Sequence, residues 1–376
     1  FRVIDAFSRI VRLGEGLSQS GELSQAAQDR AIAALKVCAD KIARRKAVKV
    51  RAVATQACRG AANGEAFLER AERETGLRLE IIPPEEEARL SVAGCSDLID
   101  RRFTSAIILD VGGGSTEMSW VRRRGGDGRP PELLTWMSAP IGVVTLAERF
   151  PEPETPTLEW FEAMVGAIAD RIAAFDGADG HREAFSDGRA QLIGTSGAIT
   201  SLAGLHLGLQ RYERAKVDGL RMQAHECRAV ADRLLGTDRA GRASEACIGP
   251  DRADLVLAGA AILEAVQRQW PCQHVRVADR GLREGMLLSL MQSRRRRRRR
   301  RGSEGLGQQV DVADREVRAP FPAHPRHKRG EGFRLGRENP HTRPVAVGYV
   351  RGHPHLGHDV GLGHRTRWIR PVLQRP

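Results

Sequence analysis

The chain has 376 residues, enough for two domains of ordinary size, and 41% of its residues are hydrophobic. Its formal net charge of +13 is typical of nucleic-acid-binding proteins, but this charge is concentrated at one end of the chain. Residues 294–376 hold 21 Lys and Arg against 7 Asp and Glu, whereas residues 1–293 hold 39 against 40. The overall charge therefore gives no reason to class residues 1–293 as nucleic-acid-binding.

The six cysteines are widely spread, and no Cys-x-x-Cys pair occurs, which argues against a zinc site or a dithiol redox centre. Unpaired cysteines are typical of a reducing compartment, so we expect a cytoplasmic protein. The sequence shows no secretory signal and no apolar run long enough to span a bilayer. We therefore expect no membrane partner.

The first 95 residues alternate between strand and helix patterns. The predicted elements are a strand or two within 1–13, a helix over 23–45, a strand over 48–54, a helix over 65–75, a strand over 77–82 and a helix that starts near 85. Asn63 is the expected N-cap of the helix over 65–75, and Gly76 is its expected stop. Pro83 and Pro84 suit the first turn of the next helix. The alternation indicates an α/β fold.

The most informative stretch, residues 107–120, reads IILDVGGGSTEMSW. An apolar run ends at Asp110, and the three glycines that follow lead into two hydroxyl residues and Glu117, which predicts a strand, a tight turn and a second strand pairing back. The backbone N–H groups of such a turn can form an anion nest, and a carboxylate at its mouth suggests Mg²⁺. The alternative is a hairpin without a ligand. We favour phosphate binding because a hairpin alone does not need this combination of residues.

Further elements follow in the second half of residues 1–293. They are a strand over 133–137, a helix over 158–175, a strand over 191–194, helices over 198–207, 225–235 and 252–269, a strand over 275–278 and a last helix that ends near 291. A second small glycine turn, residues 195–198, comes directly after the strand over 191–194. The pattern extends the α/β prediction over residues 1–293.

The last segment, residues 294–376, begins with eight consecutive arginines and has little apolar periodicity. Charge repulsion and the lack of apolar surface predict that it is disordered. It is interpreted either as a basic arm that binds nucleic acid or as an out-of-frame translation of GC-rich DNA, and we favour the second interpretation. We expect no nucleic acid partner except through this tail.

Two segments outside the glycine stretch also carry candidate chemistry. Arg59 could clamp a phosphate through two parallel hydrogen bonds, although a surface salt bridge is an equal alternative. The run Glu85, Glu86 and Glu87 could supply a general base toward water. Favourable charge at a helix start is the alternative for these three glutamates, and it is the stronger one from the residues alone.

Seven segments, in order and spacing, resemble the exopolyphosphatase/guanosine pentaphosphate phosphohydrolase (Ppx/GppA) family over about three quarters of the chain. They are ATQACRGAANGEAF, EIIPPEEEARLSVAGC, ILDVGGGSTEMSW, SAPIGVVTLAERF, IGTSGAITSLAGL, RADLVLAGAAILEA and VADRGLREGMLLSL. The resemblance implies two ribonuclease-H-like α/β domains of the sugar kinase–Hsp70–actin superfamily with a cleft between them, here residues 1–90 and 91–293. It also implies Mg²⁺-dependent hydrolysis of the terminal phosphoanhydride of inorganic polyphosphate, or of the 5′-phosphate of guanosine pentaphosphate.

The resemblance also assigns site residues by position. It places at Glu87 the catalytic glutamate, which deprotonates or orients the attacking water, and it implies Asp110 and Glu117 as residues that hold Mg²⁺ and its water shell. The phosphate-binding positions that it implies are Thr55, Arg59, Gly112, Gly113, Gly114, Ser115, Thr116, Gly194, Thr195 and Ser196. A metal ion, a phosphate-binding side chain and one general base would be enough for this reaction, because catalysis of phosphoryl transfer depends mostly on positioning and charge neutralisation.

The sequence departs from the family at its beginning, because no first phosphate loop of the form Asp-x-Gly-Thr-Asn/Ser precedes Phe1. We therefore expect a truncated N-terminal domain with an exposed sheet edge, and weak or no activity of the chain as written. The tail is the second departure. An ATP-using actin-like protein or sugar kinase is disfavoured, because EEEARL matches the phosphohydrolases.

The choice of substrate stays open from the sequence. We favour polyphosphate, with guanosine pentaphosphate as an equal or second substrate. The arginines at 101–102 and 122–124 could line a basic groove for a polyanion, or they could equally be solvated loop residues. A homodimer is compatible with the resemblance, and the sequence leaves the oligomeric state open.

Overall fold

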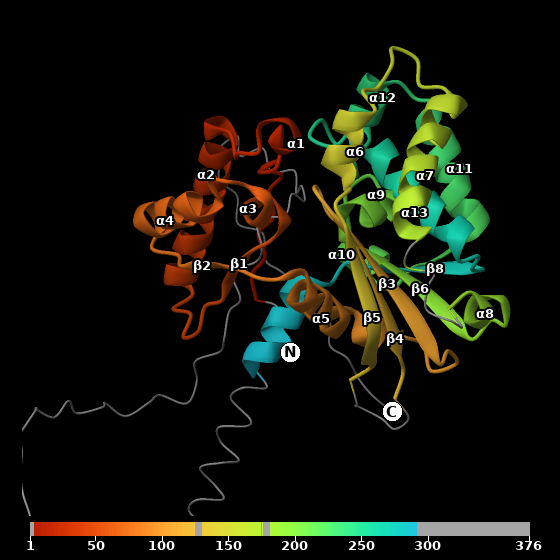
Figure 1. The fold of residues 1–376 in the computed structure, drawn as a ribbon, viewed down its shortest axis with the longest axis horizontal. Coiled ribbons are helices and arrows are strands. Elements are labelled where there is room, and N and C mark those ends of the chain that lie inside the picture. The colour runs from red at the N-terminus through yellow and green to blue at the C-terminus, as the bar shows by residue number, and fades with distance from the viewer. Residues whose placement is uncertain (1–3, 125–129, 174, 176–180, 292–376) are drawn as a thin grey trace, which may run out of the picture.

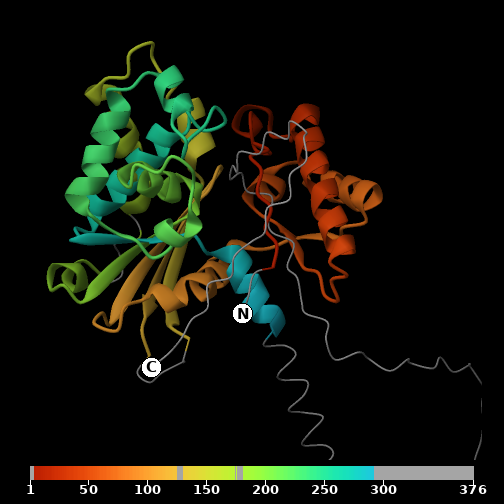
Figure 2. The ribbon, with the colours of Figure 1, turned by 180° about the vertical axis from the view of Figure 1, so that it is seen from behind.

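The computed structural model describes residues 4–124, 130–173, 175 and 181–291. Its elements form a smaller lobe, built from residues 4–82, and a larger lobe built from the later described residues, which lie side by side in Figures 1 and 2. The disorder predicted for residues 294–376 concerns residues outside the described part. Within that part, none of the helices is both long and apolar enough to cross a membrane.

The larger lobe is organised around a mixed sheet, in which six strands of the described chain pair in the order β5-β4-β3-β6-β8-β7. The strands are β3 (Ser105–Val111), β4 (Thr116–Arg122), β5 (Glu132–Ala139), β6 (Ala190–Thr195), β7 (Arg221–Gln223) and β8 (His274–Ala278). The three strands β3, β4 and β5 form an antiparallel meander, and β6 and β8 continue the sheet parallel to β3. The predicted α/β fold is therefore confirmed.

The two faces of this sheet are covered by different helices. Ile107 and Leu109 point into the main core, where α7 (Leu158–Ile172), α9 (Ser196–His206) and α13 (Val256–Gln269) pack. Ala106 and Ile108 point to the opposite face and pack against α5 (Pro84–Cys95). Successive strand residues alternate between faces, so Asp110 lies on the face covered by α5. The remaining helices of this lobe are α6 (Val143–Arg149), α8 (His181–Ser186), α10 (Arg214–Val217), α11 (Ala224–Leu235) and α12 (Arg239–Ser244).

The smaller lobe contains a parallel pair of short strands covered by helices. Its elements are α1 (Leu17–Ser20), α2 (Gln25–Arg44), β1 (Ala52–Ala54), α3 (Gln56–Gly60), α4 (Gly64–Thr75) and β2 (Leu79–Ile81). A separate apolar core holds it together, and Leu35 of α2 and Phe67 of α4 are among its most buried members. The strands are shorter than the predicted ranges 48–54 and 77–82.

A helix over residues 282–291 returns from the larger lobe and crosses α5 at close backbone contact (Figure 2). A Cβ atom on Gly94 would lie 2.0 Å from the carbonyl oxygen of Gly281, and one on Gly285 would lie 1.9 Å from the carbonyl oxygen of Leu90. Glycine is therefore required at this crossing, since both obstacles are backbone atoms. The contact fixes the position of α5 relative to the larger lobe.

The Gly285→Ala substitution is expected to lower the free energy of unfolding by about 3 kcal/mol, because overpacking a filled core forces the backbone apart. Urea denaturation followed by circular dichroism measures this effect. The matched control is Gly166→Ala in α7, where an added Cβ meets nothing within 4 Å. That change should raise stability slightly, by about 0.5 kcal/mol, because Ala is a better helix former than Gly. Equal urea midpoints for the two variants would contradict the close crossing.

The strand expected within residues 1–13 is wrong for the described residues, whereas Asn63 is the N-cap residue of α4 and Gly76 ends that helix, as predicted. The described residues 4–13 form no strand; Val11 is buried in the core of the smaller lobe, and its carbonyl accepts a hydrogen bond from Arg30 Nε at 3.0 Å in place of a strand partner. Asn63 stands at the N-cap of α4 without capping it by its side chain. That side chain instead bonds the backbone N–H and carbonyl of Leu23, at 2.8 and 3.0 Å, and ties α4 to the start of α2.

Candidate active site

The glycine turn between β3 and β4 is held from two sides. The Gly112 N–H donates to the Ser115 carbonyl at 2.8 Å, which closes the turn. The carbonyls of Gly112 and Gly113 accept hydrogen bonds from the Val143 and Val144 N–H groups at 2.9 and 2.8 Å. The start of α6 thus fixes the loop from behind, and the predicted strand–turn–strand arrangement is confirmed.

Asp110 and Glu117 stand directly opposite each other on the paired strands, and both are almost completely buried. Asp110 accepts a hydrogen bond from Ser91 Oγ at 3.2 Å, and Glu117 Oε1 accepts from Ser115 Oγ and Ser138 Oγ at 2.5 and 3.0 Å. Like charges directly opposite on a sheet repel each other. Their burial as a facing pair therefore favours a bound cation between or beside them.

The donor set suits Mg²⁺, which is usually held by one or two carboxylates together with waters and substrate phosphates. Among the described residues, no group of three or more His, Cys, Asp or Glu side chains could hold a metal ion. Asp110 and Glu117 could offer two carboxylate oxygen donors to such an ion, with water and phosphate as its other ligands. A site of this kind differs from a dedicated zinc or calcium cage.

Glu87 reaches the same region from α5. The helix starts at Pro84, where proline costs no backbone hydrogen bond, and it packs on β3, β4 and β5. Glu87 and Ser91 are one turn apart and share a face of α5, so Glu87 points to the side from which Ser91 bonds Asp110. Glu87 is fully buried, and its Oε2 lies 3.5 Å from Arg59 Nη2. The structure thus brings Glu87, Asp110 and Glu117 to one face of the sheet.

Arg59 lies beside Glu87. Its Nη1 donates to the Ile82 carbonyl at 2.6 Å, and its Nη2 donates to Gln56 Oε1 at 2.9 Å, in addition to the contact with Glu87. These contacts hold the guanidinium against the carboxylate. The surface salt bridge considered from the sequence is thus replaced by an ion pair with a buried partner, and the phosphate-binding role of Arg59 stays a prediction.

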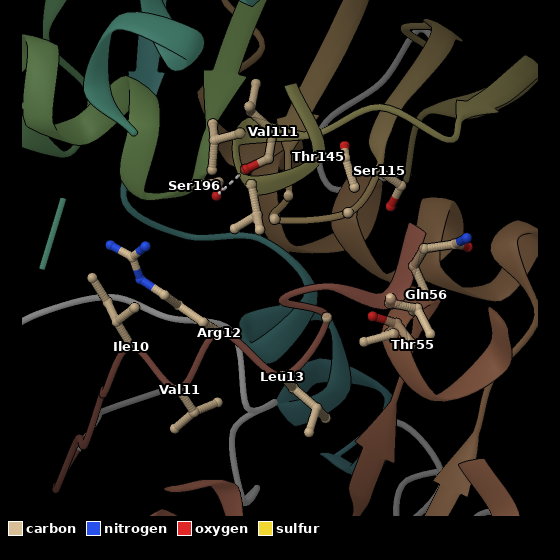
Figure 3. Close-up of a pocket in the computed structure, with 18 of the residues that line it drawn as sticks. Ile10, Val11, Arg12, Leu13, Thr55, Gln56, Val111, Ser115, Thr145 and Ser196 are labelled. Atoms are coloured by element: carbon tan, nitrogen blue, oxygen red, sulfur yellow. Dashed lines mark hydrogen bonds between the residues drawn. The ribbon is translucent and has the colours of Figure 1, made fainter. Parts of the chain in front are cut away.

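A cavity of about 390 Å³ lies between the lobes in front of the glycine turn (Figure 3). Thr55 and Gln56 line it from the smaller lobe, and Ser115 and Ser196 line it from the larger lobe. The starts of α9 and α13 also form part of its wall. Most of the lining residues are apolar, and the polar part of the wall, with two helix starts and the glycine turn, is where an anion would be favoured. Most of the predicted phosphate-binding residues therefore meet at one cavity.

The turn at Thr195 and Ser196 is fixed by side-chain hydrogen bonds. Ser196 has φ = 83°, a left-handed conformation that is uncommon outside glycine and that often marks a functional site. Its Oγ donates to the Val111 carbonyl at 2.6 Å (Figure 3). Thr195 stands opposite Asp110 in the β3–β6 register, and its Oγ1 donates to the Arg280 carbonyl at 2.7 Å. The two glycine turns of the sequence are therefore neighbours.

Arg252 is a residue of this site that the sequence analysis missed. Its buried Nη1 donates to the Gly197 carbonyl and to Ser201 Oγ at 3.1 and 2.6 Å, and the residue lines the cavity. Burial lowers the pKa of this guanidinium to about 9. The sequence did hold a signal that could have identified Arg252. It is a cation at the first position of the Ala- and Leu-rich segment 252–269, which was predicted to be a helix. The helix starts later, at Val256.

The arginines considered for a basic groove lie away from these residues. Arg122 pairs with Ser105 in the strand register, at the opposite end of β3 from Asp110, roughly 17 Å away for five strand residues. Arg122 and Arg124 form ion pairs with Glu132 at 2.9 and 3.7 Å. Arg102 is 3.7 Å from Asp100. The alternative of solvated loop residues fits these positions better.

The glycine turn lines the cavity, and the three buried carboxylates lie beside it outside the lining, an arrangement that fits the class of enzymes that act on phosphate groups. The comparison with known proteins agrees: the model of the Ppx/GppA phosphatase family matches residues 1–294, and the chain belongs to this family. The family predicted from the seven segments and the prediction of a hydrolase are thus confirmed.

Two related proteins are similar in sequence to this chain over about three quarters of its length. Exopolyphosphatase 2 of Mycobacterium tuberculosis is 28% identical over 292 residues, which cover 75% of this chain and 88% of that protein. The guanosine-5′-triphosphate,3′-diphosphate pyrophosphatase of Photobacterium profundum is 31% identical over 287 residues, which cover 75% of this chain and 53% of that protein.

Solved structures are similar as well. The crystal structure of an exopolyphosphatase-like protein aligns with a TM-score of 0.68 and 30% identity, covering 77% of this chain and 91% of that one. The Ppx/GppA family member of Aquifex aeolicus aligns with a TM-score of 0.61 and 29% identity, covering 76% of this chain and 88% of that one.

Proposed function

We propose that this protein removes the terminal phosphate from inorganic polyphosphate, with guanosine pentaphosphate as an equal or second substrate, by Mg²⁺-dependent attack of water on a phosphoanhydride bond. The observation that carries the proposal is the placement of Glu87, Asp110 and Glu117, all buried, on one sheet face beside the glycine turn. We also assign the smaller and larger lobes to two ribonuclease-H-like domains of the sugar kinase–Hsp70–actin superfamily.

Asp110 and Glu117 would hold the metal ion, because their facing carboxylates are hard oxygen donors in a buried place. When bound, Mg²⁺ supplies neutralisation of the negative charge on the phosphate groups. The hydroxyls of Ser91, Ser115 and Ser138 fix the orientation of the two carboxylates. This arrangement leaves the carboxylates in place before substrate arrives.

Glu87 is the residue of the site best suited to accept or orient the proton of an attacking water. A catalytic carboxylate works well when burial and its neighbours hold it in one position. Full burial on α5 and the contact with Arg59 provide that support. We therefore assign the general-base role to Glu87, while Asp110 and Glu117 would hold the metal ion.

The cavity would hold the phosphate groups of the substrate. The glycine turn, Thr55 and Ser196 offer backbone N–H groups and hydroxyls around it. Such groups would recognise the charge and shape of the phosphate groups. They would not distinguish substrates by the part of the molecule that lies beyond those phosphates. The two relatives named above, one an exopolyphosphatase and the other a guanosine pentaphosphate enzyme, support both substrates.

Phosphate release from long-chain polyphosphate and from guanosine pentaphosphate, each with Mg²⁺, tests the proposal. We expect release from both, faster from polyphosphate. The assay runs beside the Glu87→Gln variant, which corrects for contaminating phosphatases. Equal release by the variant and the unchanged chain would reject the proposal.

A further inference from the structure

Residues 12–18 bridge the two lobes beside the cavity. Arg12 donates to both carboxylate oxygens of Asp254, at 2.8 and 2.7 Å, and to the Asp251 carbonyl at 2.7 Å. A few residues later, Glu148 accepts hydrogen bonds from the Gly16 N–H at 2.9 Å and from Ser18 Oγ at 3.1 Å. Residues 12–18 thus contact the larger lobe at two places, and of these two contacts only the first involves a cation.

Arg12 also lines the cavity (Figure 3). The described residues that line it include two cations, Arg12 and Arg252, and no Asp or Glu. Arg252 is deeply buried and bonded to Gly197 and Ser201, so it is fixed in the wall. The Arg12 side chain is 23% exposed, and its partner Asp254 is not part of the cavity lining. Arg12 is therefore the cation at this cavity with room to change partners.

The backbone at Arg12 is strained in its present position. Its φ of 45° lies in the left-handed region, which a residue with a long side chain adopts only when other contacts hold it there. Burial would raise the pKa of Asp254, but the hydrogen bonds and charge of Arg12 outweigh this and leave that pKa lowered. The ion pair is thus one of the contacts that hold Arg12 here, together with the hydrogen bonds that the Arg12 carbonyl accepts from the Glu15 N–H and Arg30 Nη2 at 3.0 and 3.5 Å.

A guanidinium that binds a carboxylate through two parallel hydrogen bonds can bind a phosphate group in the same way. An anion in the cavity would compete directly with Asp254 for Arg12. Asp254 lies outside the cavity lining. When Arg12 leaves Asp254 for the anion, the released carboxylate would therefore not face the anion from the cavity wall.

We propose that Arg12 is a substrate-binding residue that exchanges partners: it pairs with Asp254 across the lobes when the cavity holds no anion, and it binds a phosphate group of the substrate, other than the one being cleaved, when the cavity is occupied. The inference rests on the proposed function for the identity of the anion. It assigns Asp254 the role of a competitor for the guanidinium.

This exchange makes opposite predictions for the two partners of one ion pair. In the Glu87→Gln chain, binding of inorganic tripolyphosphate with Mg²⁺ is measured by isothermal titration calorimetry at raised ionic strength, which suppresses binding to the basic tail. Arg12→Met should weaken binding about tenfold, because a charge-assisted contact is lost. Asp254→Asn should tighten binding about threefold, because the competing state is removed. Arg12→Lys should fall between the unchanged chain and Arg12→Met.

Glu148→Gln is the matched control, since it weakens the second contact of residues 12–18 with the larger lobe without involving a cation. Its affinity should stay within about twofold of the unchanged chain. A pure bridging role for Arg12 predicts that Arg12→Met and Asp254→Asn shift the affinity in the same direction, and that result would overturn the proposal. Unchanged affinity in a folded Arg12→Met chain, checked by its melting temperature, would overturn it too. Hydrolysis is measured separately, so a chain that binds tripolyphosphate without releasing phosphate would contradict only the proposed function.

Discussion

Replacing Glu87 by Gln is expected to reduce kcat for phosphate release by about 10³-fold, since a positioned general base contributes between roughly 10² and 10⁴. The amide has nearly the shape of the carboxylate but cannot take a proton from water. The Michaelis constant should change little, because the proposed phosphate contacts come from the glycine turn and from residues across the cavity. Steady-state phosphate release at saturating polyphosphate measures the effect.

The neighbouring glutamate Glu85 provides a matched control on the same helix. Its side chain is about half exposed and forms an ion pair with Arg89 at 2.8 Å, so Glu85→Gln removes the same charge from the same helix start. If the three glutamates served only to complement the helix dipole, both variants would change stability by a few tenths of a kcal/mol and leave kcat alone. A similar kcat in both variants would therefore sink the general-base role.

The parts of the site that the sequence predicted are those set by local geometry. The strand period of two and the glycine turn already place Asp110 and Glu117 across from each other, and Pro84 marks the start of α5. Short-range patterns of this kind survive folding because the backbone itself enforces them. The role of Glu87 beside these carboxylates came from the family resemblance, since helix-start charge was the stronger explanation of this glutamate from the residues alone.

The parts that the sequence missed depend on contacts between distant residues. Arg12 and Asp254 are 242 positions apart, and no periodicity in either segment points to the other. Ser91 looks like an ordinary helix residue until α5 is packed on β3. The expected strand within 1–13 failed for a related reason, because alternating apolar residues can be buried by packing alone, as Val11 is, without a partner strand.

Replacing Asp110 by Asn is expected to abolish the response to Mg²⁺ while stabilising the metal-free protein. In the absence of a metal ion, Asp110 and Glu117 are buried like charges in direct register, and removing one of them should raise the free energy of unfolding by up to about 1 kcal/mol. The unchanged chain should instead gain about 2.7 kcal/mol from Mg²⁺ at 100 times its dissociation constant, because the ion binds only the folded state. Phosphate release by Asp110→Asn should fall at least about 10²-fold.

Thermal unfolding with and without Mg²⁺ separates charge from hydrogen bonding at this pair. The control Ser138→Ala removes a hydrogen bond to Glu117 Oε1 but leaves both charges in place, so it should lower stability in the metal-free state and keep the Mg²⁺-induced rise. Asp110→Asn should therefore raise the stability of the metal-free protein, and Ser138→Ala should lower it. If the carboxylate pair were only structural, both substitutions could lower it. If Asp110→Asn destabilised the metal-free chain as Ser138→Ala does and kept the full rise with Mg²⁺, the carboxylates would be structural, and the metal site would have to lie elsewhere.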